Sequence, residues 1–235
     1  MSHASGEDLA LLLEKLPLRK TDLAADIATG TGHTALAIAP RAARVVGVDR
    51  VLAMLAEART VAQTRNCANV AWLRGDASAT GLASGAFDVV TCRRAAHHFP
   101  DVSAFPSEVR RLLRPGGRLG LVDQVVSDDC EAAELTEAME KIHDASHARG
   151  LPVSEWQATI RGAGFDVQFS QVLEDRVLLR RFVSTSKDAD ATRAAIHRFL
   201  AATRPEVLEK IGYAKDANRT RSFIKLRLVL VAVRK

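Results

Sequence analysis

The chain has 235 residues, enough for one α/β domain or for one such domain with a modest lid. Its 33 basic and 28 acidic residues give a net charge of only +5, and the basic residues are spread along the chain rather than gathered in a block. Aromatic residues make up 5% of the chain, too few for a set of base-stacking platforms. The composition therefore argues against a nucleic-acid-binding protein.

The three cysteines, Cys67, Cys92 and Cys130, are widely spaced and form no CxxC pair. This pattern is typical of buried, reduced thiols and offers neither a zinc site nor a disulfide framework. No apolar run is long enough to span a membrane, and the acidic, amphipathic start of the chain is unlike a signal peptide. We therefore expect a cytoplasmic protein with no metal site and no membrane span.

Short apolar runs alternate with helical patterns along the first two-thirds of the chain, which is typical of βαβ units and a mostly parallel sheet. The pattern predicts strands at residues 23–28, 45–49, 70–76, 87–93 and 118–125. It predicts helices at residues 6–15, 33–41, 51–62 and 108–113, the last of them closed by a Pro-Gly-Gly stop signal.

The pattern changes after residue 125. Helices are predicted at residues 128–148, 154–165 and 189–203, and strands at 166–173 and 224–233. Because there is no internal repeat and no linker rich in Gly, Ser or Pro, we expect a single domain over residues 1–235. Its lid or substrate insertions are predicted at about 124–152 and 185–222.

A glycine turn follows the first predicted strand and opens the next helix, in the sequence Asp26-Ile-Ala-Thr-Gly30-Thr-Gly32. Glycines here let the backbone turn tightly and approach a ligand, and the start of the helix offers unpaired N–H groups. Asp49 ends the second strand about 20 positions beyond Gly30, where a carboxylate can accept both ribose hydroxyls of an adenosine ligand.

The glycine spacing alone also satisfies the NAD fingerprint. Asp26, however, precedes the glycines, where its carboxylate would face the amino group of a methionine moiety and would repel a pyrophosphate. Asp76 ends the third strand, placed to bind an adenine amino group, and the apolar last strand suits a reversed sheet edge. These features favour S-adenosylmethionine (SAM) over NAD.

The chain resembles the class I SAM-dependent methyltransferases, and more narrowly the branch near the ubiquinone/menaquinone-biosynthesis C-methyltransferases. The resemblance is carried by DIATGTGHTALAIAP, VVGVDRVLAMLAEAR, LRGDASATGLASGAFDVVTCRRAAHHFPDV, EVRRLLRPGGRLGLVD and HDASHARGLPVSEWQATIRGAGF. It implies a Rossmann-like α/β fold: a seven-stranded, mostly parallel sheet with its last strand antiparallel, helices on both faces and a helical lid.

The resemblance also implies a cofactor site. Asp26 and the backbone of Gly30 and Gly32 would hold the amino acid part of SAM, Asp49 its ribose, and Asp76 with Ala77 its adenine. The remaining predicted cofactor-binding residues are Ala28, Arg50, Met54, Arg93 and Arg94, the last of which could instead bind an anionic substrate.

Ala28 departs from the family pattern, which usually has glycine at this position. We expect alanine to tolerate the dihedral angles at a strand end, so that binding persists with a slightly altered turn. The alternative is a degenerate site that no longer binds SAM.

Three histidines are candidates for proton transfer. His97 and His98 follow the fourth strand, beside the expected methyl group, and either one could serve as a general base or simply pack against the cofactor. His143 and His147 lie four positions apart, on one face of the predicted lid helix. His143 is predicted to contact the substrate or SAM, and no third ligand for a metal is apparent.

We expect the acceptor to be a small molecule rather than nucleic acid, because the charge excess is small. The NPPY-like tetrad of related base-modifying enzymes is also absent after the fourth strand, where this chain reads RRAA and then HHF. Two other function classes stay open, a SAM-binding protein that does not methylate and an NAD-dependent oxidoreductase. A homodimer is an open alternative to the monomer.

Overall fold

The computed structural model describes residues 6–235. Its strands form one sheet in the order β3-β2-β1-β4-β5-β9-β7, with the two-residue strands β6 and β8 pairing with β5 and β9. The strands are β1 (Leu23–Ile27), β2 (Arg44–Asp49), β3 (Val70–Arg74), β4 (Phe87–Arg93), β5 (Leu113–Val126), β6 (Leu151–Pro152), β7 (Phe165–Leu178), β8 (Ala214–Lys215) and β9 (Arg221–Arg234). The α-helices are α1 (Glu7–Lys15), α2 (His33–Ile38), α3 (Leu52–Thr64), α4 (Ala104–Leu112), α5 (Cys130–His143), α6 (Val153–Gly162), α7 (Leu179–Ser184), α8 (Ala189–Ala202) and α9 (Pro205–Lys210).

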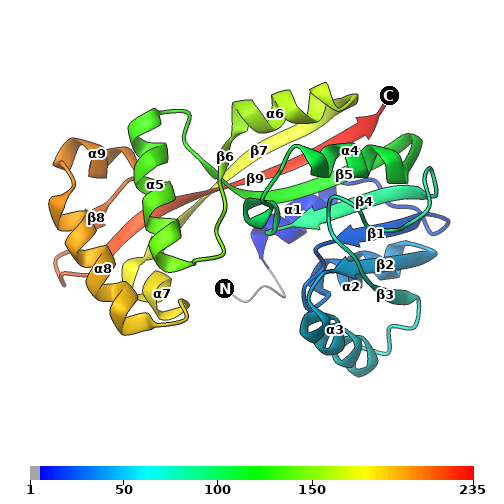
Figure 1. Ribbon diagram of the computed structural model, residues 1–235, viewed down its shortest axis with the longest axis horizontal. Coiled ribbons are helices and arrows are strands. Elements are labelled where there is room, and N and C mark those ends of the chain that lie inside the picture. The colour runs from blue at the N-terminus through cyan, green and yellow to red at the C-terminus, as the bar shows by residue number, and fades with distance from the viewer. Residues whose placement is uncertain (1–5) are drawn as a thin grey trace. The chain divides into compact units, whose positions relative to one another are not determined.

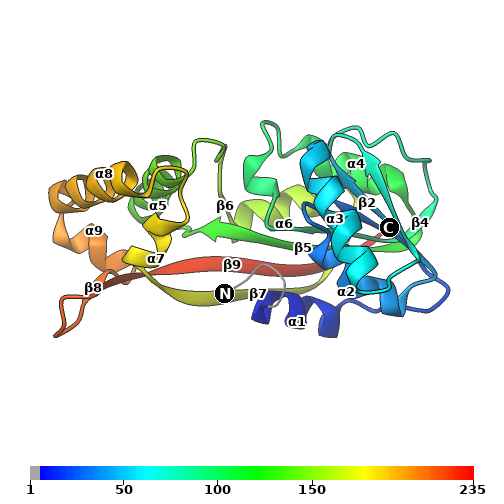
Figure 2. The same cartoon turned by 90° about the horizontal axis from the view of Figure 1, so that it is seen from below.

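Strands β1 to β5 are parallel to their neighbours, and β9 runs in the opposite direction to β5 (Figures 1 and 2). Figure 2 shows α1 on one side of the sheet and α4 and α6 on the other. Residues 24–27 of β1 are all buried, so both faces of this strand are covered, as is typical of a parallel sheet with helices on both sides. The predicted Rossmann-like fold is confirmed. Its seven long strands are those expected, and β6 and β8 are two short additions.

The described chain groups into two compact units. The first comprises the described part of Met1–Asp123 with Gln157–Gln171 and Leu228–Lys235, and the second comprises Gln124–Trp156 and Val172–Arg227. The two insertions predicted from the sequence fall largely within the second unit, and the single-domain interpretation stays a prediction. Among residues 6–235, no helix is long and apolar enough to cross a membrane.

The second unit has an apolar core of its own, built by α5, α7, α8 and α9. Helix α5 has a buried face within this core that the sequence pattern did not single out. Ala132, Leu135 and Met139 of α5 are buried, because positions three and four apart share a helix face and here meet the neighbouring helices.

Two expectations are corrected by the local structure. Helix α5 ends at His143, so His147 lies beyond it and the two histidines do not share a helix face. Cys130 is exposed at the start of α5, although Cys92 is buried as expected.

Candidate active site

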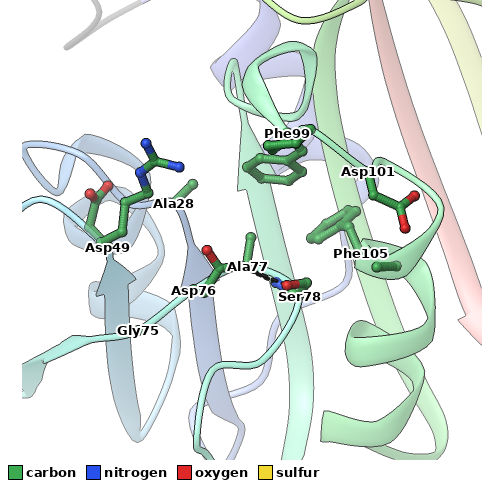
Figure 3. Close-up of a pocket in the computed structure, with 12 residues that line it drawn as sticks. Ala28, Asp49, Gly75, Asp76, Ala77, Ser78, Phe99, Asp101 and Phe105 are labelled. Carbon is green, nitrogen blue, oxygen red and sulfur yellow. Dashed lines mark hydrogen bonds between the residues drawn. The ribbon is translucent and has the colours of Figure 1, made fainter. Parts of the chain in front are cut away.

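A pocket of about 290 Å³ lies at the carboxyl ends of the first parallel strands (Figure 3). Five residues predicted to bind the cofactor line it: Ala28, Asp49, Arg50, Asp76 and Ala77. The rest of the lining, which sequence reasoning missed, comprises Gly75, Ser78, Phe99, Pro100, Asp101, Ala104 and Phe105. The position follows from the topology, since ligands of open parallel sheets bind outside the carboxyl ends of the strands.

Asp49 ends β2 and is held in place by two backbone donors. The Gly30 N–H donates to its Oδ2 at 2.8 Å, and the Val51 N–H donates to its Oδ1 at 2.9 Å. Each carboxylate oxygen has a second lone pair, so the group keeps capacity for a ligand hydroxyl. The bond from Gly30 also means that this turn N–H is already engaged by a carboxylate.

Asp26 holds the glycine turn and the start of α2 in place through hydrogen bonds. It is fully buried and is not among the residues that line the pocket. Its Oδ2 accepts hydrogen bonds from Thr29 Oγ1 at 2.6 Å and from the Ala35 N–H at 3.1 Å, and its Oδ1 accepts from Thr91 Oγ1 at 2.7 Å. Burial raises the pKa of Asp26 to about 6, although these hydrogen bonds oppose the shift.

The prediction of unpaired N–H groups at the start of the helix is therefore wrong for Ala35, and the Gly30 N–H in the preceding turn is engaged as well. The Ala35 N–H in the first turn of α2 is engaged by Asp26, and the Gly30 N–H by Asp49. Both partners are carboxylates of the chain itself, so these two donors face negative charge rather than an open anion site.

Ala28 has a φ of +53°, in the left-handed region that favours glycine. The expectation that alanine meets only ordinary strand-end dihedral angles here is therefore wrong. A non-glycine residue in this region costs about 1–2 kcal/mol. The alanine is thus a strained substitute at the position where the family pattern has glycine, and its methyl group lies in the pocket wall (Figure 3).

Glycine is favoured at positions 30 and 32 of the turn for different structural reasons. A Cβ at Gly32 would lie 2.4 Å from the ring of Trp72, and one at Gly47 would lie 2.5 Å from the same ring, so Trp72 packs directly on both backbones. A Cβ at Gly30 would meet nothing within 4 Å, and glycine is favoured there by its φ of +54° alone. A side chain would therefore have room at position 30, whereas Trp72 fills the space at position 32.

Three carboxylates and one guanidinium line the pocket, from Asp49, Asp76, Asp101 and Arg50. Asp76 accepts hydrogen bonds from the Ser78 N–H at 2.9 Å and from Ser78 Oγ at 2.6 Å, which lower its pKa. The pocket therefore carries an excess of negative charge, which suits a cationic ligand better than a pyrophosphate.

Phe99 and Phe105 form an apolar wall opposite Asp49 and Ala28 (Figure 3). Their ring centroids lie 5.4 Å apart. Phe105 begins the buried face of α4, whereas Phe99 follows the short 3-10 turn Ala96–His98 beyond the end of β4. The proximity of Phe99 to that strand end was the only signal in the sequence for this wall.

Arg93 and Arg94, at the end of β4, both bind the buried carboxylate of Asp8 on α1. Arg94 Nε lies 2.7 Å from Asp8 Oδ2, and Arg93 Nη2 lies 3.3 Å from Oδ1. Burial lowers the pKa of the Arg93 guanidinium. Neither arginine is among the pocket-lining residues, so their cofactor-binding role stays a prediction.

His97 and His98 lie side by side after β4, with ring centroids 4.0 Å apart. His97 Nδ1 lies 2.7 Å from Oδ1 of Asp123, a buried residue of β5, and the His97 N–H donates to Asp123 Oδ2 at 2.7 Å. A carboxylate oxygen facing Nδ1 favours the tautomer that carries its proton there, which leaves Nε2 as the basic nitrogen. Sequence reasoning named both histidines and missed Asp123.

The remaining predicted residues lie elsewhere. Met54 is exposed on α3 and does not line the pocket. His143 belongs to the second unit, where its ring stacks on Phe182 with centroids 4.3 Å apart and its Nε2 lies 3.0 Å from Thr185 Oγ1. Burial lowers the pKa of His143, and its contacts are those of a packed core residue. Its substrate role stays a prediction.

Comparisons with known proteins agree with this architecture. Residues 25–121 match the family model of a methyltransferase domain. The uncharacterized methyltransferase YcgJ of Bacillus subtilis is 39% identical over 155 residues, which cover 66% of this chain and 61% of that protein. The demethylmenaquinone methyltransferase of Thermus thermophilus is 44% identical over 115 residues, 48% of this chain and 50% of that protein. The matched region thus spans half to three-fifths of these curated relatives.

Two solved structures match almost the whole chain. A candidate methyltransferase from Bacillus halodurans superposes with a TM-score of 0.92 at 29% identity, covering 97% of this chain and 99% of that one. The YcgJ protein of Bacillus subtilis gives a TM-score of 0.86 at 28% identity, covering 97% and 98%. The resemblance to class I methyltransferases inferred from the sequence is confirmed, since a methyltransferase domain model, relatives named as methyltransferases and a methyltransferase structure all match the chain.

Proposed function

We propose that the protein transfers a methyl group from SAM to a small-molecule acceptor. The observation that carries this proposal is the charge of the pocket at the carboxyl ends of the strands, where three carboxylates face one guanidinium. The Gly30 N–H, a donor that a dinucleotide pyrophosphate would need, is engaged by Asp49. A cationic adenosine ligand fits these groups and a dinucleotide does not.

The residues present fit the adenosine part of SAM. Asp49 is proposed to accept the ribose hydroxyls, because its orientation is fixed by two backbone donors and its oxygens retain lone pairs. Asp76 and Ala77 are proposed to contact the adenine, with Phe99 and Phe105 as its apolar wall. A volume of about 290 Å³ is at the lower end for ligand pockets, as suits a nucleoside.

SAM, when bound, supplies a methyl group already activated on a sulfonium, so the chain's main tasks are positioning and the exclusion of water. An acceptor that must lose a proton also needs a base. We propose His97 for that role, because Asp123 orients its ring from the Nδ1 side. His98 is the neighbouring alternative, and His143 of the second unit is a further one.

A small-molecule acceptor is supported by the relatives. Several are named as methyltransferases of demethylmenaquinone, and another as a nocamycin O-methyltransferase. Solved structures with the same fold at 16% identity include geranyl diphosphate methyltransferase in complex with SAM. We propose that residues 124–152 and 185–222 select the acceptor, within a single functional domain that works as a monomer or a homodimer.

The test is a methyl-transfer assay with tritiated SAM against three acceptor pools: nucleic acid, total protein and a small-molecule extract of the source cell. We expect label in the extract and none in the macromolecules. An Asp49→Ala variant, assayed in parallel, should lose most of the transfer. Label confined to nucleic acid or protein would contradict a small-molecule acceptor.

A further inference from the structure

A second pocket, of about 300 Å³, lies within the second unit, and four arginines are among the residues that line it. Its floor is formed by Leu179 and Val183 of α7, both buried. The charged and polar residues around it are Arg180, Arg193, His197, Asn218, Arg219, Thr220 and Arg221. No carboxylate lines this pocket, in contrast to the acidic pocket of the first unit.

The arginines come from separate elements that the fold brings together. Arg180 is on α7, Arg193 and His197 are one turn apart on α8, and Arg221 begins β9. Figure 1 shows α7, α8 and the β8–β9 hairpin grouped at one end of this unit. Positions 180 and 221 are so distant in sequence that the basic cluster exists only in the folded chain.

Most of this charge is not neutralised within the protein. Arg193 pairs with Asp190 at 2.8 Å, on the exposed surface of α8. Within the described residues, Arg180, Arg219 and Arg221 form no ion pair with an acid. The positive charges of Arg221 and Arg193 act with burial to lower the pKa of His197, so these groups face one another closely enough to repel.

The hairpin loop that carries Arg219 is held in a strained conformation. Arg219 has a φ of +62°, a left-handed angle that is uncommon for a residue with a Cβ. Asp216 fixes the loop, since its Oδ1 accepts from the Thr220 N–H at 2.7 Å and its backbone carbonyl accepts from the Arg219 N–H at 3.0 Å. The loop thus fixes the backbone of Arg219 at the rim of the pocket.

We propose that this pocket binds a phosphate or diphosphate group of a small molecule. Guanidinium groups match phosphate oxygens with paired N–H donors, and a multiply charged anion would offset the repulsion among the cations. The size of the pocket suits one such group on a small ligand rather than the continuous backbone of a nucleic acid. The proposal does not depend on the pocket of the first unit or on its cofactor.

The test is calorimetric titration of the full chain with inorganic pyrophosphate, for the parent and for three single variants. Arg221→Gln and Arg193→Gln should each weaken binding about tenfold or more, since each removes a charged donor. Arg198→Gln is the matched control, because Arg198 is exposed on the same helix and does not line the pocket. Its affinity should equal that of the parent.

Two further measurements complete the test. Thermal unfolding of each variant tests whether it folds. Where a variant does not fold, the parent is titrated with pyrophosphate at rising salt concentration, and its affinity for pyrophosphate is expected to fall. A single-stranded RNA oligonucleotide is titrated as the competing ligand. No pyrophosphate binding by the parent, equal binding by all four proteins, or RNA binding that pyrophosphate does not displace would overturn the proposal.

Discussion

Asp123 binds His97 twice: one carboxylate oxygen lies 2.7 Å from the ring Nδ1, and the other accepts from the His97 backbone N–H at 2.7 Å. Asp123 is 1% exposed and His97 is half-buried, so the pair is shielded from competing water. A buried carboxylate in this position fixes both the tautomer and the orientation of an imidazole.

If His97 is the base of the reaction, Asp123→Asn should lower kcat roughly 100-fold, within the range of general acid–base catalysis, while KM changes little. The amide can donate to Nδ1 and so favours the wrong tautomer. Asp166→Asn, an exposed carboxylate on β7, is the control. Equal kcat values for the two variants would show that the pair is only structural.

Ala28→Gly should stabilise the protein by about 1 kcal/mol, because the residue has a φ of +53° and glycine removes the clash of its Cβ. Urea unfolding monitored by circular dichroism gives the change directly. Ala24→Gly, within the preceding strand β1 and fully buried, should instead destabilise the protein. Destabilisation by both changes would mean that Ala28 is unstrained.

If the Asp26 carboxylate faces the amino group of SAM, as the sequence predicts, SAM binding should weaken as the pH falls through about 6, the pKa to which burial raises Asp26. A cationic ligand favours the carboxylate form, so each pH unit below 6 should cost about tenfold in affinity, with proton release on binding. The contribution of Asp26 to folding stability depends on pH in the opposite direction. The raised pKa means that this group's contribution is fully present below its unfolded value of 3.8 and is lost as the pH rises through about 6.

Calorimetry between pH 5 and pH 8, in two buffers of different ionisation enthalpy, measures both the affinity and the proton release. In an Asp26→Asn variant, the affinity for SAM should lose the pH dependence that Asp26 causes. The proton release on binding should be lost as well. A parent protein whose affinity for SAM is constant across this range would rule out an interaction between Asp26 and the ligand.

Local sequence patterns predicted the strands and the polar residues at their ends. Strand β4 was predicted to the residue, and Asp49 and Asp76 were predicted at strand ends that line the pocket. The φ of Ala28 was mispredicted, because alanine gives no sign of a left-handed turn where the family residue is glycine. The packing partners of α5 were not predicted, because its buried residues contact helices that lie far away in the sequence.

Other features depend on contacts between distant segments. Asp123 was read as a strand residue, and only the pairing of β4 with β5 brings it to His97. The arginine pocket of the second unit joins elements from residue 179 to residue 221, and no local window contains it. Such sites follow from packing rather than from periodicity, so a single sequence does not reveal them.

The most direct test of the central claim is calorimetric titration of the purified protein with SAM and, separately, with NAD. We expect SAM to bind with micromolar-order affinity and NAD not to bind. Asp49→Ala should weaken SAM binding by about 1.5–3 kcal/mol, the range for hydrogen bonds to a charged group, without loss of the fold. NAD binding without SAM binding, or an Asp49→Ala variant that binds SAM as the parent does, would contradict the account.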